Sequence, residues 1–247
     1  MGKKEKLIEE ITHLLNDEKT LEKYLIENCN LPGTRTNLEL IFAFAEVFRK
    51  KQILKKWLLI TANIADANNP QSFLPMCALV CFGKLYVETS DEEILGYLKK
   101  FSNDSRWRIR ECVAFAFQII GEKNFRELEH IFTDWFPAAN NLEKRAMLVA
   151  LAHPPLLNKE SAAHAIDITD RILSQFDEGP DIDILKKSLE FVISVYTVAN
   201  PVLGFRLLEK WIGKGKPFNS IIKSNLNKNR LVKNFPEQVA KYKSMLN

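Results

Sequence analysis

The 247-residue chain is poor in the residues that interrupt helices or that build other scaffolds. It has only 9 glycines and 10 prolines, which favours long helices joined by short connections. It has 4 cysteines, and two of them, Cys77 and Cys81, would share one helix face rather than form the Cys-x-x-Cys knuckles of a zinc site. The sequence therefore predicts buried, reduced thiols without a metal, in a reducing intracellular compartment.

Long apolar runs and common catalytic motifs are also absent from the sequence. No stretch reaches the roughly 18 uninterrupted apolar residues that a membrane span requires. The N-terminus starts basic but turns acidic before an apolar block forms, unlike a signal peptide. The sequence has no Gly-rich phosphate loop, no GxSxG elbow and no HExxH motif. We therefore expect a soluble cytoplasmic protein with no cofactor, no metal and no membrane partner.

What the chain does contain is the composition of a globular protein with helical periodicity. Apolar residues make up 46% of the chain and charged residues 27%, which argues against disorder. Residues 103–120 are the clearest example, because capping residues at Asn103-Asp104-Ser105 precede an amphipathic stripe that starts at Trp107. No segment reads as a strand. We expect helices over residues 4–15, 17–28, 35–50, 52–67, 71–87, 90–101, 103–120, 125–136, 141–152, 161–176, 181–198, 201–212, 219–227 and 236–246.

These expected helices come in pairs that recur about every 35 residues. Aligning the second helix of each pair places six residues in one column, with successive separations of 35, 35, 35, 42 and 36 residues. The longer interval coincides with a Gly-Pro loop at 179–180, outside the helices. The sixth fragment is polar, as expected for a terminal repeat that caps a stack. The column consists of Leu40, Pro75, Arg110, Arg145, Lys187 and Lys223.

The period and two motifs resemble HEAT-like repeats, a family of helical hairpins. The motifs are Asp104-x-x-Trp107-Arg-x-Arg110-Glu111 and Leu142-Glu-Lys-Arg145-Ala, which match the family's basic residue early in the second helix. Leu40 and Pro75 depart from that pattern.

This resemblance covers nearly the whole chain and implies its architecture. The implied fold is an all-α, right-handed α-α superhelix of about six helical hairpins, with the second helices lining its concave face. It would form one domain over residues 1–247, with an N-terminal cap over about 1–30 and a basic C-terminal cap over about 214–247.

Two charge patterns suggest binding surfaces. In the superhelix, Arg110, Arg145, Lys187 and Lys223 would form a ladder spaced by roughly 10 Å, which could follow a phosphate backbone. The alternative is that each cation bonds the acid of a neighbouring turn and orders the stack. Residues 201–247 hold ten lysines and arginines against two acids, a net charge of +8 that includes Lys228 and Arg230. This segment is either an anion-binding surface or a solvated cap.

A second, more distant resemblance concerns HEAT-like DNA glycosylases that remove alkylated purines. That family uses concave-face tryptophans, a catalytic Asp and an Arg that holds DNA. Trp107 and Glu111 lie one helical turn apart, and Arg145 follows one repeat later. The match is incomplete, because Glu111 stands where the family has Asp, and Arg108 and Arg110 can neutralise it.

The interpretation that follows is a non-catalytic HEAT-repeat scaffold that binds a protein or peptide on its concave face. The alternative is a nucleic-acid-binding protein related to the HEAT-like glycosylases, with or without catalytic activity. If the chain is an enzyme, Trp107 and Glu111 are its candidate catalytic residues. The candidate binding residues are Arg106, Arg108, Arg110, Arg145, Lys187, Lys223, Lys228 and Arg230.

Overall fold

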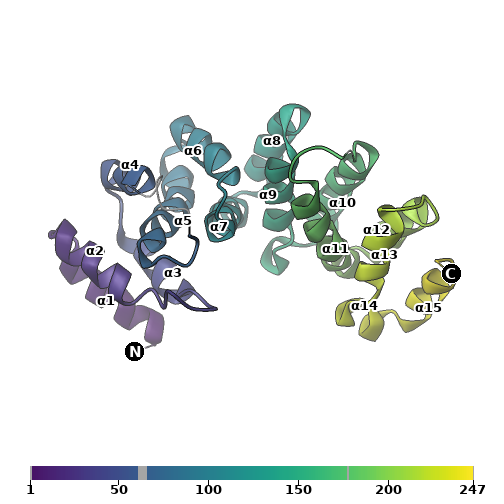
Figure 1. Ribbon diagram of the computed structural model, residues 1–247, viewed down its shortest axis with the longest axis horizontal. Helices are drawn as coiled ribbons and strands as arrows, with labels where there is room; N and C mark the ends of the chain where they lie inside the picture. The colour runs from purple at the N-terminus through teal and green to yellow at the C-terminus, as the bar shows by residue number, and fades with distance from the viewer. Residues whose placement is uncertain (1, 61–65, 177, 247) are drawn as a thin grey trace. The chain divides into compact units, whose positions relative to one another are not determined.

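A computed structural model describes residues 2–60, 66–176 and 178–246 (Figure 1). These residues form α-helices, short 3-10 turns and loops, and none of them lies in a strand. The predicted all-α class is therefore confirmed. The chain divides into two compact units, residues 1–123 and 124–247, each of which buries its own apolar side chains.

The first unit contains helices α1 to α7. They are α1 Lys3–Leu14, α2 Glu18–Glu27, α3 Leu38–Val47, α4 Lys51–Ile60, α5 Phe73–Thr89, α6 Glu92–Ser102 and α7 Trp107–Lys123. The odd-numbered helices pack in a row, since α1 contacts α3, α3 contacts α5, and α5 contacts α7. The even-numbered helices are joined by ion pairs. Lys56 of α4 binds Glu18 of α2, and Lys55 of α4 binds Glu93 of α6, each at 2.6 Å.

Helix α5 is the central helix of the first unit. Its residues from Phe73 to Gly83 are all buried. It approaches α7 so closely that a Cβ added at Gly83 would lie 2.7 Å from backbone atoms of Ala116, so only glycine fits there. Within the described part of the chain, the helical segment Pro70–Thr89 is long and apolar enough to cross a membrane by length and composition, and 78% of its apolar 18-residue window is buried in the protein.

The second unit contains helices α8 to α15. They are α8 Phe125–Trp135, α9 Asn141–Leu151, α10 Lys159–Ser174, α11 Ile182–Ala199, α12 Pro201–Trp211, α13 Phe218–Leu226, α14 Asn229–Asn234 and α15 Pro236–Ser244. Helices α9, α11 and α13 pack in a row, and α10 contacts α12. Buried Asn225 fastens α13 to α11, because its amide accepts from Ser194 N at 2.8 Å and donates to Leu189 O at 2.7 Å.

Several helices begin next to a capping residue that lies a few positions away from the expected boundary. The helix expected over 35–50 begins at Leu38, because Asn37 accepts a hydrogen bond from Leu40 N at 3.2 Å. The helix expected from residue 161 begins two residues earlier, where Asn158 accepts from Glu160 N at 2.8 Å. The polar helix α14 was not predicted, because its six residues carry no periodic apolar pattern.

Two other helix ends differ from expectation. The helix expected to end at residue 120 continues through Gly121 to Lys123, and Asn124 caps the next helix. The helix expected over 52–67 is described only as Lys51–Ile60, and residues 61–65 lie outside the described part of the chain.

The six column residues occupy equivalent places along the chain. Each lies within the first two turns of a different odd-numbered helix, from α3 to α13. These are the same helices that pack in rows within each unit.

Candidate functional site

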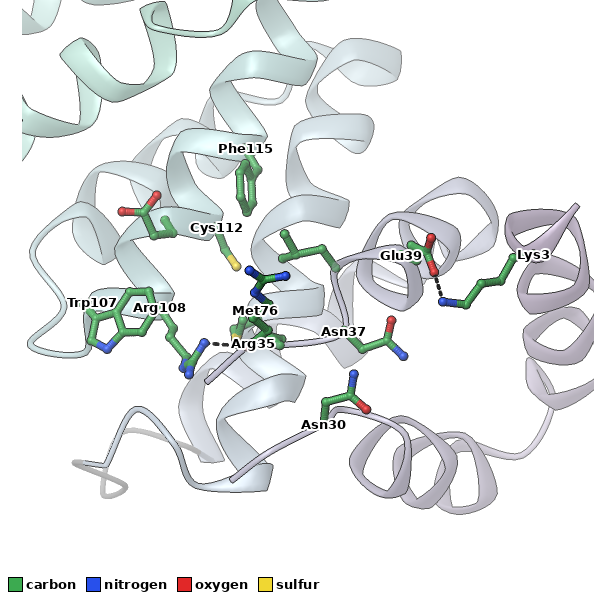
Figure 2. A pocket seen from close by; sticks show the side chains of 13 residues that line it. Lys3, Asn30, Arg35, Asn37, Glu39, Met76, Trp107, Arg108, Cys112 and Phe115 are labelled. Atoms are coloured by element: carbon green, nitrogen blue, oxygen red, sulfur yellow. Dashed lines mark hydrogen bonds and ion pairs between the residues drawn. The ribbon is translucent and has the colours of Figure 1, made fainter. Parts of the chain in front are cut away.

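A pocket of about 680 Å³ opens in the first unit, beside the first turns of α3, α5 and α7 (Figure 2). Helix α1 and the loop over residues 30–37 complete its wall. Its volume falls within the roughly 300–1,000 Å³ of ordinary ligand sites. The lining residues are Lys3, Asn30, Arg35, Thr36, Asn37, Leu38, Glu39, Met76, Trp107, Arg108, Glu111, Cys112 and Phe115.

The apolar part of the pocket includes two large side chains that are exposed to solvent. Trp107 is 48% exposed and Leu38 is 41% exposed, while Met76 beside them is buried. Phe115 packs against Phe42 of α3 with ring centroids 5.6 Å apart. Because Trp107 and Leu38 line one concavity, the pocket is a candidate interaction site.

Arg108 holds the pocket loop against α7. Its guanidinium is 5% exposed and donates to Gly33 O at 2.7 Å, to Thr36 Oγ1 at 2.9 Å and to Asn68 Oδ1 at 3.0 Å. The planar guanidinium group carries several N–H donors in fixed directions, which suits three acceptors that come from two different loops. This arginine therefore orders the wall of the pocket.

The indole of Trp107 lies against the same arginine. The Arg108 Cζ atom is 4.4 Å from the Trp107 ring centroid, a cation–π contact that positions the ring at the start of α7. Glu111 follows one turn later, is half-buried and also lines the pocket. The structure thus brings Trp107, Arg108 and Glu111 to one site.

The rim of the pocket carries charges of both signs. Lys3 forms an ion pair with Glu39. Arg35 is exposed and makes no hydrogen bond or ion pair with any residue that the structure describes. Figure 2 shows Arg35 and Met76 between Trp107 on one side and the Lys3–Glu39 pair on the other. Arg35 is therefore an available cation at the centre of a partly apolar pocket.

Arg106 and Arg110 lie beside this site but do not line it. Both are buried, at 4% and 7% exposure. Arg106 binds the Asp104 carboxylate through two nitrogens at 2.7 and 2.8 Å. Arg110 donates to the carbonyls of Asp104 and Ser105 at 2.6 and 2.9 Å. Their contacts order the turn before α7.

The remaining candidate residues lie in the second unit. Arg145 of α9 is half-buried, and Lys187 of α11 and Lys223 of α13 are exposed. Lys228 is half-buried in the turn before α14, and Arg230 is exposed within α14. None of these residues lines the pocket, whose lining residues all lie between Lys3 and Phe115.

Cys112 also lines the pocket, and its side chain is buried. Burial raises the pKa of its thiol well above the usual value, so the thiol stays protonated at neutral pH. Across the described ranges, no group of three or more His, Cys, Asp or Glu side chains could hold a metal ion. The pocket can therefore offer apolar surface, a guanidinium and carboxylates.

The sequence-based reasoning missed Arg35 and Leu38, which complete the site. The repeat register already contained a hint of their position, because Asn37 and Trp107 each stand three residues before a column residue. Both of them line the pocket. The register therefore pointed to the first turn of α3 as a counterpart of the first turn of α7.

Comparison with models of protein families, with curated protein sequences and with solved structures finds no match to this chain.

Proposed function

We propose that this protein is a non-catalytic scaffold of HEAT-like repeats whose first unit binds a peptide segment of a partner protein. The observation that carries the proposal is the exposure of Trp107 and Leu38 at one pocket, together with the available guanidinium of Arg35. Tryptophan and arginine are the residues most enriched at the energetic centres of protein interfaces.

The repeat architecture is part of this proposal and rests on recurrent spacing. Polar contacts between neighbouring helical pairs join residues at similar sequence separations. These are 38 residues for Lys56–Glu18 and 40 residues for Lys210–Asp170. A right-handed superhelix, in which each pair packs only on its neighbours, accounts for this regularity.

The polarity of the pocket favours a peptide over a phosphate backbone. A groove that follows phosphates is lined by cations. Here the lining combines aromatic and aliphatic side chains with two carboxylates, Glu39 and Glu111. Lys3 is already neutralised by Glu39. Mixed polarity of this kind matches the apolar centre and polar rim of protein interfaces.

The chemistry of the lining specifies the partner segment. An aromatic or branched aliphatic side chain would fill the space beside Trp107 and Leu38. A carboxylate two to four residues away along the peptide would meet Arg35. The first turns of α3 and α7 face the pocket, and the positive ends of their dipoles add to the preference for an acidic group.

A displayed library of random peptides, selected on the full chain, tests this function. We expect selected peptides to share an apolar anchor with a neighbouring Asp or Glu. Replacing Trp107 with Ala should weaken their binding about tenfold or more, as for an interface hot spot. Replacing Arg35 with Gln should weaken it about two- to fivefold, with a larger effect at low salt.

Leu59 supplies a matched control. It is 65% exposed and lies in the same unit, but it does not line the pocket. Leu59→Ala should leave peptide affinity unchanged, whereas Leu38→Ala should reduce it. A selection that yields no peptide dependent on Trp107 would contradict the proposal.

A base-excision role is the second candidate, because Trp107 and Glu111 line the same pocket. An aromatic face can stack on a flipped base, and a carboxylate can stabilise the cation that forms when the glycosidic bond breaks. Release of an alkylated purine from DNA, lost on Glu111→Gln, would support it. No release at high enzyme concentration would exclude it.

A further inference from the structure

The segment that contains the last three helices has a concentration of cations that the rest of the chain does not have. Residues 213–246 contain eight lysines and arginines and a single acid, Glu237. We call this set the C-terminal cationic cluster. Its members are Lys214, Lys216, Lys223, Lys228, Arg230, Lys233, Lys241 and Lys243.

The members of this cluster are not neutralised within the protein. None of the eight forms an ion pair with an acidic side chain in the described part of the chain. The last cation before the cluster behaves differently, since Lys210 binds Asp170 at 2.5 Å. Asp170 of α10 therefore joins α12 to its neighbour, whereas the cluster remains a positive surface.

The cations occupy a small volume. Helices α13, α14 and α15 contact one another, and they contain nine, six and nine residues. A nine-residue helix is about 14 Å long. On three short helices in contact, the distance between neighbouring charges is within or near one Debye length, which is about 10 Å at 0.1 M salt. They therefore repel one another until a polyanion replaces their counterions.

The exposed faces of these helices supply neutral donors beside the charges. Lys223 of α13 and the C-cap residue Asn227 stand one turn apart and both are exposed, while Ile222 and Leu226 are buried. On α14, Leu231 is buried, while Arg230, Lys233 and Asn234 are exposed. Lysine, arginine and asparagine are among the side chains that contact phosphate and sugar oxygens.

From this combination we propose that the C-terminal cationic cluster binds the sugar–phosphate backbone of nucleic acid without reading its sequence. This inference is independent of the peptide pocket, because it concerns a different unit. A membrane surface fits less well. The large apolar side chains exposed in this segment are Val232 and Met245, and neither Trp nor Phe is exposed there. Stable membrane attachment needs an apolar anchor besides basic charge.

Fluorescence anisotropy with a labelled 25-nucleotide DNA, single-stranded and as a duplex of unrelated sequence, tests the inference on the full chain. We expect both to bind. If the cluster neutralises about four phosphates of a single strand, affinity should fall about 50-fold between 50 and 200 mM salt. A second DNA of scrambled sequence should bind equally well.

A triple variant locates the contact. Lys223→Gln, Arg230→Gln and Lys233→Gln replace exposed side chains that have no ion-pair partner, so the fold should be retained. The magnitude of the log–log salt slope for the single strand should fall by about 2. The matched control replaces three exposed cations elsewhere, Lys6, Lys100 and Arg126, with Gln. It changes the net charge equally and should keep the wild-type slope.

Three results would overturn the inference. One is the absence of binding at 50 mM salt. Another is an equal loss of affinity in the triple variant and in the control, which would mean a diffuse charge effect. The third is tighter binding to polyglutamate or to vesicles containing phosphatidylserine than to DNA at equal charge concentration, which would assign the surface to an acidic protein or to a membrane.

Discussion

Three cations of the first unit, Arg49, Lys51 and Lys55, have acidic partners on helix α5 or α6, and in this they differ from the C-terminal cationic cluster. In the first unit, Arg49 binds Glu88 through two nitrogens, with contacts from 2.7 to 3.0 Å. Lys51 and Lys55 of α4 both bind Glu93 of α6, at 2.7 and 2.6 Å. In the cluster, no cation has such a partner among the described residues.

The paired cations of the first unit contribute to helix packing, whereas the cations of the cluster are available to a ligand. Exposed ion pairs contribute only about 0–1 kcal/mol each, so their main effect in the first unit is to select one register between neighbouring helical pairs. In the cluster, the lysines and arginines form no such pairs between helices, and they repel one another. Such a surface favours binding of anions over stability.

Among the substitutions that test this difference, the largest change in stability is expected at Arg108. Replacing it with Met should lower the free energy of unfolding by about 2–4 kcal/mol, because this buried side chain loses its hydrogen bonds to the pocket loop and to Asn68. Urea denaturation measures the change. Arg230→Met, at an exposed arginine of the cluster, should change it by less than about 0.5 kcal/mol. Equal losses of stability in Arg108→Met and Arg230→Met would contradict the distinction between the first unit and the cluster.

A smaller effect is expected for the pair Arg49–Glu88. A double-mutant cycle with Arg49→Met and Glu88→Gln should give a coupling energy of about 0.5–1 kcal/mol, the upper range for an exposed pair, because the contact is bidentate. The pair Lys23–Glu27, at 3.8 Å and largely exposed, should couple more weakly. A weaker coupling for Arg49–Glu88 than for Lys23–Glu27 would contradict the expectation.

The pH dependence of the first unit should reflect Glu93. Hydrogen bonds from Lys51 and then Lys55 lower the pKa of its carboxyl to about 2. A carboxyl with a depressed pKa contributes stability above its unfolded pKa, near 4.5, and this contribution is lost as the pH falls from there toward 2. NMR titration should show the low pKa in wild type and a higher value in Lys55→Met. A value unchanged by that substitution would exclude Lys55 as a cause.

The smallest effect on stability is expected from neutralising the cluster. The triple variant Lys223→Gln, Arg230→Gln and Lys233→Gln should match wild type within about 0.5 kcal/mol at 150 mM salt. At low salt it should be slightly more stable, because repulsion is reduced. Thermal unfolding at two salt concentrations checks the sign. A loss of stability at low salt would show that these cations have structural partners after all.

Most of the fold could be predicted from local features of the sequence. Apolar spacing predicted the helices because each packs one face against its row, and capping residues such as Asp17 and Asp91 marked their starts. The predicted helix boundaries were wrong where a second capping residue lies nearby and caps the helix instead, as Asn37 and Asn158 do. Helix α14 failed because a helix of six residues depends on contacts with α11 and α15 rather than on its own pattern.

The candidate site could be predicted only in part. Trp107 and Glu111 stood out because they share a helix face one turn apart. Arg35 and Leu38 did not, because they reach the pocket only when α3 and α7, joined through α5, lie in one row. Arg106 and Arg110 looked like surface cations in the sequence. Their burial depends on how Asp104 and the turn before α7 fold back on them.

The helical class, the similar spacing of the odd-numbered helices along the chain and the excess of positive charge at the C-terminal end could all be read from the amino-acid sequence. These properties follow from periodicity and composition, which are local or additive. Only the tertiary structure decided which cations are neutralised and which remain available. An ion pair such as Lys55–Glu93 joins residues 38 positions apart. Likewise, the pocket exists because residues from Lys3 to Phe115 meet at one place.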